Sequence, residues 1–263
     1  MNHIISNWNE LTADQQAAVL KKMEESPSFE KSDEPNPAAV FFQTAGWVKL
    51  EKFISKEMAS LLYHHVKLSA ARLAYIEEQF PEKNNHEYYG MFGDGQIPGD
   101  FCRYGDPIFD ALVDTSLGQV QEIAEVPLMS NYSYYRLYTT GSELKRHKDR
   151  PSCEYSVTVC LGYDVSNVDQ NTYPNYDWPM FIDANGTELP VHMKPGDAII
   201  YRGCDIDHWR QPFWGLNHAQ VFLHYNELNG QYNICNDGRA IMGLSEYFKP
   251  VDALQSNYTP GKE

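Results

Sequence analysis

The chain has 263 residues, of which 42% are hydrophobic, a length and content that suit a single domain with one large core. Its formal net charge of −15 gives the surface a negative potential that repels phosphate backbones, so we expect no nucleic-acid partner. No apolar run reaches the roughly 18 residues of a membrane-spanning helix, and the N-terminus lacks the basic and apolar regions of a secretory leader, so we expect a cytoplasmic protein without a membrane partner.

We predict three parts along the chain. Residues 1–37 form an N-terminal helix and linker, because a capping box that begins at Thr12 starts a short amphipathic helix. The stretch 26–37 that follows is too rich in Ser, Pro, Glu and Lys to pack. Residues 38–250 form the single structured domain, and residues 251–263 form a C-terminal tail.

The domain is predicted to open with a strand from Phe41 through Val48, followed by a helix that Ser55 caps. A second helix begins at Pro107, whose fixed φ suits a first helical turn. Between the helices, residues 77–106 combine Pro, Gly, Asn and aromatic residues without the period of a helix or a strand. A loop of this length in a compact domain is usually functional, so we predict that it serves as a lid.

From Asn131 onward the pattern changes to short strands separated by Gly, Pro, Asn and Asp. The clearest strand alternates apolar and small polar residues, which is typical of one buried and one polar face. The series indicates an antiparallel sandwich or barrel, so the fold class is mainly β with flanking helices. The predicted strands are 132–138, 155–161, 179–183, 189–193, 198–202 and 219–225.

A candidate metal site lies in this β-rich half. His147 and Asp149 are two residues apart, so in an extended backbone their side chains project to the same side and can bind one cation. His208 follows near the end of the series of strands. Two histidines and one carboxylate on one face of an octahedron leave three positions open for a co-substrate and dioxygen, which suits iron(II). A closed zinc site would need a fourth ligand of the same kind.

The stretch from Tyr138 to Asp149 resembles a known family. It reads Y-x-x-G-x-x-x-x-x-H-x-D, and Tyr138, His147 and Asp149 keep the intervals of the same run in the prolyl 4-hydroxylase-like 2-oxoglutarate oxygenases. Residues 156–162 are similar to the central strand of that family, and residues 195–198 resemble its turn before the strand that leads to the distal histidine.

The resemblance implies a fold, a metal and a co-substrate. The fold would be a double-stranded β-helix, also called a jelly-roll or cupin-like fold, with iron(II) at its open end. His147, Asp149 and His208 would be the catalytic metal ligands. The co-substrate 2-oxoglutarate would chelate the iron, and Tyr138 would donate a hydrogen bond to its distal carboxylate. Dioxygen would be the second co-substrate, with ascorbate as a candidate reductant.

The basic residue that the family uses for the distal carboxylate differs in this sequence. Such enzymes carry Lys or Arg on the last strand, where this chain has His218. Two alternatives remain. A protonated His218 could act with Gln220 as a neutral donor beside it. Arg210 could instead form a bidentate clamp, because it lies two residues after His208 and so on the same side of an extended strand.

Three further residues are candidates for binding the substrate. Arg150 and Glu154 flank the metal motif and could orient a polar group, although such a pair in a loop is more often a solvated face. Trp209, next to the distal ligand, could form an apolar wall, although aromatic residues of β-rich domains mostly belong to the core.

These features together predict an iron(II)- and 2-oxoglutarate-dependent oxygenase. It would hydroxylate an unactivated C–H bond of a small amino-acid-like or peptidyl substrate and release succinate and carbon dioxide. Asp149 favours hydroxylation over halogenation, because related halogenases carry Gly or Ala at that position. Two alternatives remain: a metal-binding jelly-roll module without oxygenase activity, and a non-oxidative Lewis-acid enzyme with the same three ligands. We make no prediction of the oligomeric state.

Overall fold

The computed structural model describes residues 36–245 except positions 170, 236 and 240. The predicted helix after Thr12, most of the predicted linker and the predicted tail lie outside these residues. Within them, no helix combines the length and the apolar character that crossing a bilayer requires.

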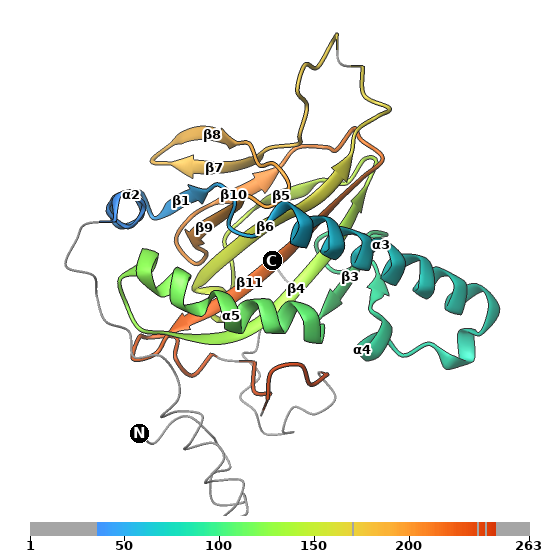
Figure 1. Ribbon diagram of the computed structural model, residues 1–263, viewed down its shortest axis with the longest axis horizontal. Coiled ribbons are helices and arrows are strands. Elements are labelled where there is room, and N and C mark those ends of the chain that lie inside the picture. Colours follow the sequence, from blue (N-terminus) through green and yellow to red (C-terminus); the bar gives the residue numbers. More distant parts are fainter. Residues whose placement is uncertain (1–35, 170, 236, 240, 246–263) are drawn as a thin grey trace, which may run out of the picture.

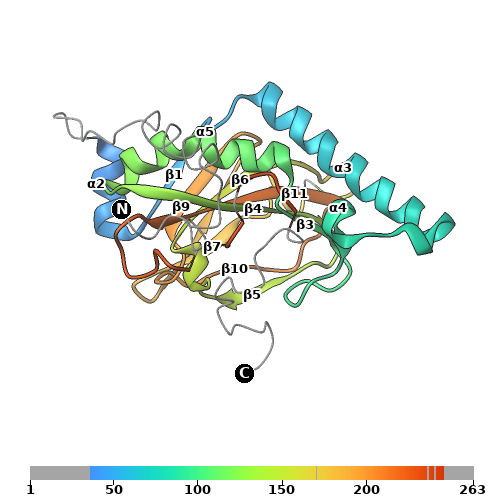
Figure 2. The same ribbon diagram turned by 90° about the horizontal axis from the view of Figure 1, so that it is seen from below.

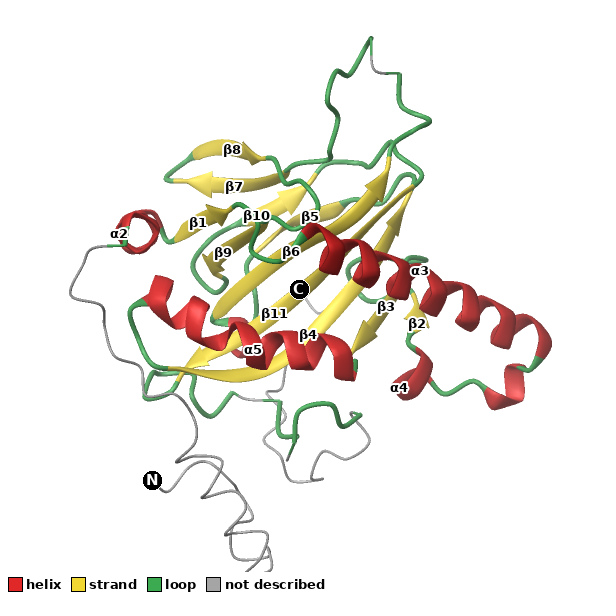
Figure 3. Ribbon diagram, in the orientation of Figure 1, coloured by secondary structure: helices red, strands yellow, loops and turns green. Residues whose placement is uncertain are grey.

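Two sheets form the centre of the molecule, and helices lie around them (Figure 1 and Figure 3). All strand pairs in both sheets are antiparallel. The large sheet has the order β1 (Trp47–Leu50), β9 (Ala198–Arg202), β6 (Tyr155–Asp164), β11 (Asn217–Glu227), β4 (Leu128–Thr139), β3 (Phe101–Tyr104) and β2 (Met91–Phe92). The small sheet has the order β5 (Leu144–His147), β10 (His208–Arg210), β7 (Met180–Ala184) and β8 (Thr187–Val191). The helices are α2 (Pro37–Ala45), α3 (Lys56–Gln79), α4 (His86–Tyr89) and α5 (Pro107–Ala124), with short 3₁₀ turns η2 (Pro81–Lys83) and η3 (Pro151–Cys153).

Helices α3 and α5 cover one side of the large sheet, and β5 and β10 of the small sheet lie on its other side (Figure 2). The residues of strand β6 alternate between these two sides of the large sheet. Its odd-numbered residues 155–161 belong to the main hydrophobic core under the helices. Its even-numbered residues 156–160 are also buried, and Cys160 packs with Met180 and Ile182 of the small sheet. The predicted polar face of this strand is therefore not exposed to solvent. It lines the space between the two sheets, which we call the inner face.

The two predicted long helices are confirmed, and their caps explain where they begin. The Ser55 side chain accepts a hydrogen bond from the backbone N–H of Met58 before α3. The Asp106 side chain does the same for Ile108 before α5, whose first residue is Pro107. Both helices bury an apolar face in the main core.

The predicted strand from Phe41 through Val48 is wrong in its first half. Residues 37–45 form α2, because the Asn36 side chain caps Ala38 N–H, Pro37 occupies the first turn and Gly46 ends the helix with a left-handed φ of 77°. Strand β1 begins only at Trp47, where the chain pairs with β9.

The predicted long loop 77–106 is largely structured. It contains the end of α3, η2, α4 and the strands β2 and β3. The strand β3 forms because it pairs with β4, with Phe101 opposite Leu137. Since this partner is distant in sequence, the residues of β3 themselves show no alternating pattern from which the strand could be predicted. Only the connection from Gly93 to Asp100, between β2 and β3, remains a loop without regular structure in the second half of this region. We call it the β2–β3 loop.

The six predicted strands in the second half of the chain are confirmed as β4, β6, β7, β8, β9 and β11, with ends shifted by a few residues. The mainly β class with flanking helices is likewise confirmed. Strands β5 and β10, which have four and three residues, were not predicted. These two strands carry both histidines of the predicted metal site.

Candidate metal centre

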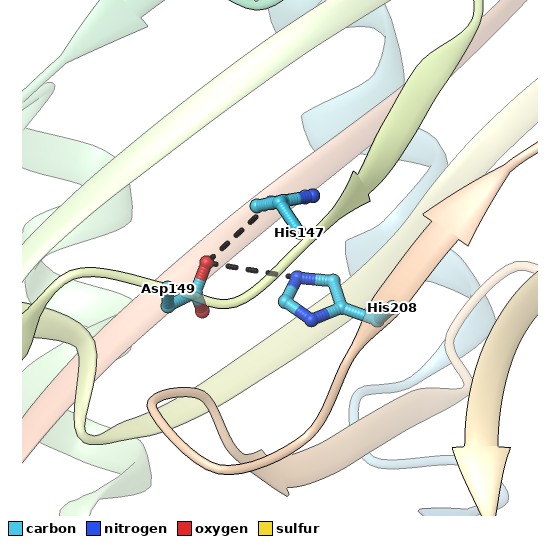
Figure 4. A group of neighbouring side chains, drawn as sticks. All are labelled: His147, Asp149 and His208. Carbon is cyan, nitrogen blue, oxygen red and sulfur yellow. Dashed lines mark ion pairs between the residues drawn. The ribbon is translucent and has the colours of Figure 1, made fainter. Parts of the chain in front are cut away.

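The three predicted metal ligands meet at the ends of β5 and β10 (Figure 4). The two strands are adjacent, and His147 lies directly opposite His208 in the antiparallel register. Asp149 follows β5, and its Oδ1 lies 3.7 Å from His147 Nε2 and 3.6 Å from His208 Nε2. The side chain of His147 is 21% exposed and that of His208 is 3% exposed, so solvent reaches the group from the His147 side.

Backbone carbonyls orient both imidazole rings. His147 Nδ1 donates to the carbonyl oxygen of Lys145 at 2.7 Å, and His208 Nδ1 donates to that of Ile206 at 3.0 Å. Because a carbonyl can only accept, each ring carries its proton on Nδ1 and presents the lone pair of Nε2 to the shared space. This is the tautomer that a metal ligand needs.

A second set of contacts orients Asp149. Its backbone N–H donates to the carbonyl of Gly203 at 2.8 Å, and its Oδ2 accepts a 2.8 Å hydrogen bond from the Ser156 hydroxyl. The Ser156 oxygen in turn lies 3.0 Å from His224 Nδ1. Since the serine proton goes to the carboxylate, His224 donates to the serine, and the chain His224 to Ser156 to Asp149 leaves Oδ1 facing the histidines.

Gly203 is required by the position of Asp149. A Cβ atom at residue 203 would lie 2.6 Å from Asp149 Oδ2 and 2.2 Å from the carbonyl oxygen of Cys153. Both distances are far below a van der Waals contact. Any side chain at this position would therefore displace the carboxylate or the turn that follows it.

The electrostatics keep His147 and Asp149 in their metal-binding forms at neutral pH. Burial, and next to it the neighbouring His208, lowers the pKa of His147. Burial alone would raise the pKa of Asp149, but the nearby imidazoles and the Ser156 hydrogen bond outweigh it and lower that pKa below its usual value. A neutral imidazole and an ionised carboxylate are the forms that bind a cation.

These residues fit iron(II). Two imidazole nitrogens and one carboxylate oxygen on one side of a shared space form the facial set that leaves coordination positions open. Cys153 and His224 also lie near Asp149. Burial raises the pKa of the Cys153 thiol to about 12, and its sulfur lies 2.9 Å from the Tyr132 hydroxyl. Cys153 therefore already has a hydrogen-bond partner within the protein, whereas the two Nε2 atoms and Asp149 Oδ1 face one another.

A second group of buried polar side chains lies on the inner face beyond the histidines. It surrounds Trp178, whose ring lies 4.8 Å from that of Tyr138, 5.3 Å from that of His218 and 4.6 Å from the Arg210 guanidinium carbon. Gln220 follows His218 on the same side of β11, and all four are nearly or completely buried. We call Tyr138, Arg210, His218 and Gln220 the distal polar cluster.

The distal polar cluster contains several unsatisfied groups. Arg210 Nη1 donates to the carbonyl of Trp178, but Arg210 Nη2, His218 Nδ1 and both amide atoms of Gln220 have no hydrogen-bond partner within the part of the chain that the structure describes. Among the described residues, no carboxylate lies within ion-pairing distance of Arg210. Each buried unsatisfied polar group costs about 1 to 3 kcal/mol. The cluster therefore has the composition of a binding site for an anion.

The two alternatives for the basic residue differ in charge. Burial and the adjacent Arg210 charge lower the pKa of His218 well below its usual value. His218 is consequently neutral at physiological pH and can offer only a neutral donor. Burial also lowers the pKa of Arg210, but from so high a value that the guanidinium stays charged. Arg210 is therefore the cation of the distal polar cluster.

The three candidate substrate residues all have partners within the protein. Arg150 donates to the Tyr132 hydroxyl through Nη2 at 2.7 Å and Nε at 3.2 Å. The Glu154 carboxylate accepts the backbone N–H of residue 227 at 2.9 Å. Trp209 stacks on Phe181 with ring centres 5.7 Å apart. Their roles in substrate binding stay predictions.

Four residues near the site were missed in the sequence analysis: Arg136, Ser156, Gly203 and His224. Ser156 and His224 lie on strands that were predicted, but their inward direction shows only when the two sheets are stacked. Arg136 had a local signal. It lies two residues before Tyr138 on β4, and residues two apart on a strand point to the same face of the sheet.

No protein-family model and no curated protein matches the sequence. Several solved structures are similar. HygX from Streptomyces hygroscopicus with nickel, 2-oxoglutarate and hygromycin B bound aligns with a TM-score of 0.54 and 13% identity over 74% of this chain and 88% of that chain. EctD from S. alaskensis in its apo form aligns with a TM-score of 0.53 and 15% identity, over 77% and 81%. A prolyl-4-hydroxylase of Pseudomonas putida aligns with a TM-score of 0.51 and 16% identity, over 72% and 97%.

The likeness confirms the predicted double-stranded β-helix fold. At these identities the likeness shows the fold alone.

Proposed function

We propose that the protein is a non-haem iron(II)- and 2-oxoglutarate-dependent oxygenase that hydroxylates an unactivated C–H bond of a small amino-acid-like or peptidyl substrate. The observation that carries this proposal is the buried Arg210, which has no ion-pair partner in the described part of the chain and lies two residues from His208 along β10. Two strand residues span about 7 Å, a separation that suits a five-carbon dicarboxylate with one end at the metal. An open set of metal ligands next to an unpaired buried cation is what such a co-substrate requires.

In this proposal His147, Asp149 and His208 hold the iron. Bound iron supplies the oxidation of a C–H bond by dioxygen, coupled to decarboxylation of 2-oxoglutarate to succinate and carbon dioxide. The residues of the chain orient the ligands, exclude water from the inner face and bind the two organic molecules. Dioxygen is the second co-substrate, and ascorbate is a candidate reductant.

The distal polar cluster would bind the far carboxylate of 2-oxoglutarate. Arg210 would pair with it through Nη2, which has no other acceptor. Tyr138 and Gln220 would donate neutral hydrogen bonds, and His218 would do so through its free Nδ1 in the matching tautomer. A buried cation without a counter-ion destabilises a fold, so binding of the anion would increase the free energy of unfolding.

The two alternative functions lose support. A binding module without oxygenase activity was favoured by the absence of Lys or Arg at position 218, but Arg210 supplies a cation at the same place. A Lewis-acid enzyme has no evident use for a second anion site buried beside its metal. We retain a small molecule or peptide as the expected partner, and the cytoplasm as the expected location.

Anaerobic titration tests the proposal. The protein is loaded with iron(II) and then with 2-oxoglutarate, and the weak visible charge-transfer band of the chelate is followed. We expect the band in the wild type, its loss in His208→Ala, and a shift to much higher 2-oxoglutarate concentration in Arg210→Gln. The control is Arg146→Gln, because Arg146 is a partly exposed residue of β5 that pairs with Asp183. Tight iron binding without a band in the wild type would contradict the proposal.

A further inference from the structure

The inner face carries a second buried guanidinium, that of Arg136 on β4, which is 6% exposed. Every second residue of β4 points to this face. At one end of the row the Tyr132 ring packs against that of His224, with ring centres 4.6 Å apart, and His224 orients Asp149 through Ser156. At the other end Tyr138 belongs to the distal polar cluster. Arg136 therefore lies between the metal ligands and the proposed co-substrate site.

Arg136 and Tyr134 together bind a carboxylate. Oδ2 of Asp94 accepts hydrogen bonds from Arg136 Nε at 2.9 Å, from Arg136 Nη2 and from the Tyr134 hydroxyl at 2.6 Å. The guanidinium also lies over the rings of Tyr134 and Phe222, which hold it in place. We call Arg136 and Tyr134 the carboxylate cradle. Its donors converge on one oxygen, a geometry that is specific for an anion.

The occupant of the cradle comes from a loop and not from the sheet. Asp94 lies in the β2–β3 loop, whose ends are joined by a hydrogen bond from Gly93 N–H to the carbonyl of Asp100. The loop reaches the inner face through side chains, among them Asp94 on the cradle and Ile97 against the hydrophobic residues around Tyr138. Moving Asp94 off the cradle breaks no pairing of β3 with β4. It does change the turn of the loop, because Asp94 Oδ1 accepts the backbone N–H groups of Gln96 and Ile97, and Gln96 Oε1 accepts a hydrogen bond from Arg136 Nη2 at 2.7 Å.

A second observation points to a ligand next to the cradle. Gln220 lies directly opposite Arg136 in the register of β11 and β4. It is completely buried, and neither its Nε2 nor its Oε1 has a partner. The proposed 2-oxoglutarate site can use Nε2, but a carboxylate cannot satisfy Oε1, which needs a donor. A molecule with a carboxylate and a neighbouring N–H or O–H group would satisfy both Arg136 and Gln220.

We propose, on the basis of the oxygenase function above, that the carboxylate cradle binds the carboxylate of the substrate in place of Asp94. The substrate class is then a carboxylic acid of amino-acid type. The inner face has two buried arginines, and the far carboxylate of 2-oxoglutarate needs one of them. Among the described residues Arg210 has no ion-pair partner, which suits the binding of the co-substrate. Arg136 is paired with Asp94, which the carboxylate of the substrate must displace.

Binding to the protein loaded with nickel(II) and 2-oxoglutarate tests this inference without turnover. The probes are the twenty free L-amino acids and their carboxamides, and binding is measured by titration calorimetry. We expect at least one free acid to bind while its carboxamide does not. Asp94→Asn should bind that acid about tenfold more tightly, because the competing charge is gone and the cradle is open in a larger fraction of molecules. Arg136→Gln should lose the binding, and Arg146→Gln should keep it.

Three results would overturn the inference: equal binding of acid and carboxamide, unchanged affinity in Arg136→Gln, or no probe that binds Asp94→Asn. Asp94→Asn keeps the size of the side chain and should fold. It therefore provides a test even if Arg136→Gln does not fold. The same titrations on metal-free protein separate the two proposals. Acid binding there, without any binding of 2-oxoglutarate to the nickel form, would support the cradle and count against the oxygenase.

Discussion

The hydroxyl of Ser156 donates a 2.8 Å hydrogen bond to Oδ2 of Asp149. The other oxygen of that carboxylate faces His147 and His208 at 3.7 and 3.6 Å. One oxygen is thus held by the protein, and the other is free for a cation. A carboxylate that binds through one oxygen leaves three positions of an octahedral metal open, which is the number that a chelating co-substrate and dioxygen need.

Removing this hydrogen bond should weaken metal binding. In Ser156→Ala the carboxylate loses its orientation, and we expect the affinity for iron(II) to fall about 10- to 100-fold, the usual effect of losing a group that orients a metal ligand. Competition with a metal-sensitive dye under anaerobic conditions measures it. Ser166→Ala removes an exposed hydroxyl elsewhere and should change nothing. Wild-type affinity in Ser156→Ala would show that Asp149 is held by its backbone alone.

Gly203→Ala should damage the metal centre more than the fold. The added methyl group would meet Asp149 Oδ2 at 2.6 Å and the carbonyl of Cys153 at 2.2 Å. We expect iron(II) binding to be lost and the free energy of unfolding to fall by about 1 to 3 kcal/mol. The matched control is Gly118→Ala, because position 118 lies in α5 with open space around it. That change should increase stability by up to about 1 kcal/mol. Urea unfolding measures the change in the free energy of unfolding of both variants, and metal titration measures their affinity for iron(II).

The ion pair between Asp94 and Arg136 predicts a dependence of stability on pH. Burial alone would raise the pKa of Asp94, but Arg136 and the Tyr134 hydroxyl outweigh it and lower that pKa below its usual value of 3.8. A lowered pKa in the folded state stabilises the fold fully above the usual value, and this contribution disappears as the pH falls through the lowered one. Asp94→Asn should therefore be about 1 to 3 kcal/mol less stable than wild type at pH 7.

The difference between Asp94→Asn and wild type should shrink steadily below about pH 4. Urea unfolding at a series of pH values measures it. A difference that stays constant across this range would mean that the carboxylate charge contributes nothing, and that the variant acts only through the shape of the loop.

Arg210→Met should separate stability from co-substrate binding. Arg210 is buried and has no ion pair with any described residue. Replacing such a buried charge with an apolar side chain of similar length is often neutral or stabilising. We expect the variant to unfold at the wild-type temperature or above it. Saturating 2-oxoglutarate with nickel(II) should raise the unfolding temperature of the wild type, equivalent to about 2.7 kcal/mol at a hundred times Kd, but not that of Arg210→Met. An equal rise in both proteins would exclude Arg210 from the co-substrate site.

Local signals in the sequence determined much of the fold. The helices after Ser55 and Asp106 were predictable because their caps and apolar spacing lie within a few neighbouring residues. The six strands of the second half were predictable from a period of two and from their turns. The pair His147 and Asp149 was visible for the same reason, since two residues of extended chain point the same way.

Tertiary structure decided what depends on partners distant in sequence. The short strands β5 and β10 carry no period of their own and exist because they pair with each other and because β10 also pairs with β7. The choice of Arg210 over His218 as the buried cation follows from burial and from one charge acting on the other, neither of which a linear sequence contains. The roles of His224 and Gly203 could not be predicted either, since both come near Asp149 only after the two sheets have stacked. A side chain acquires such partners when the chain folds and not from its neighbours in sequence.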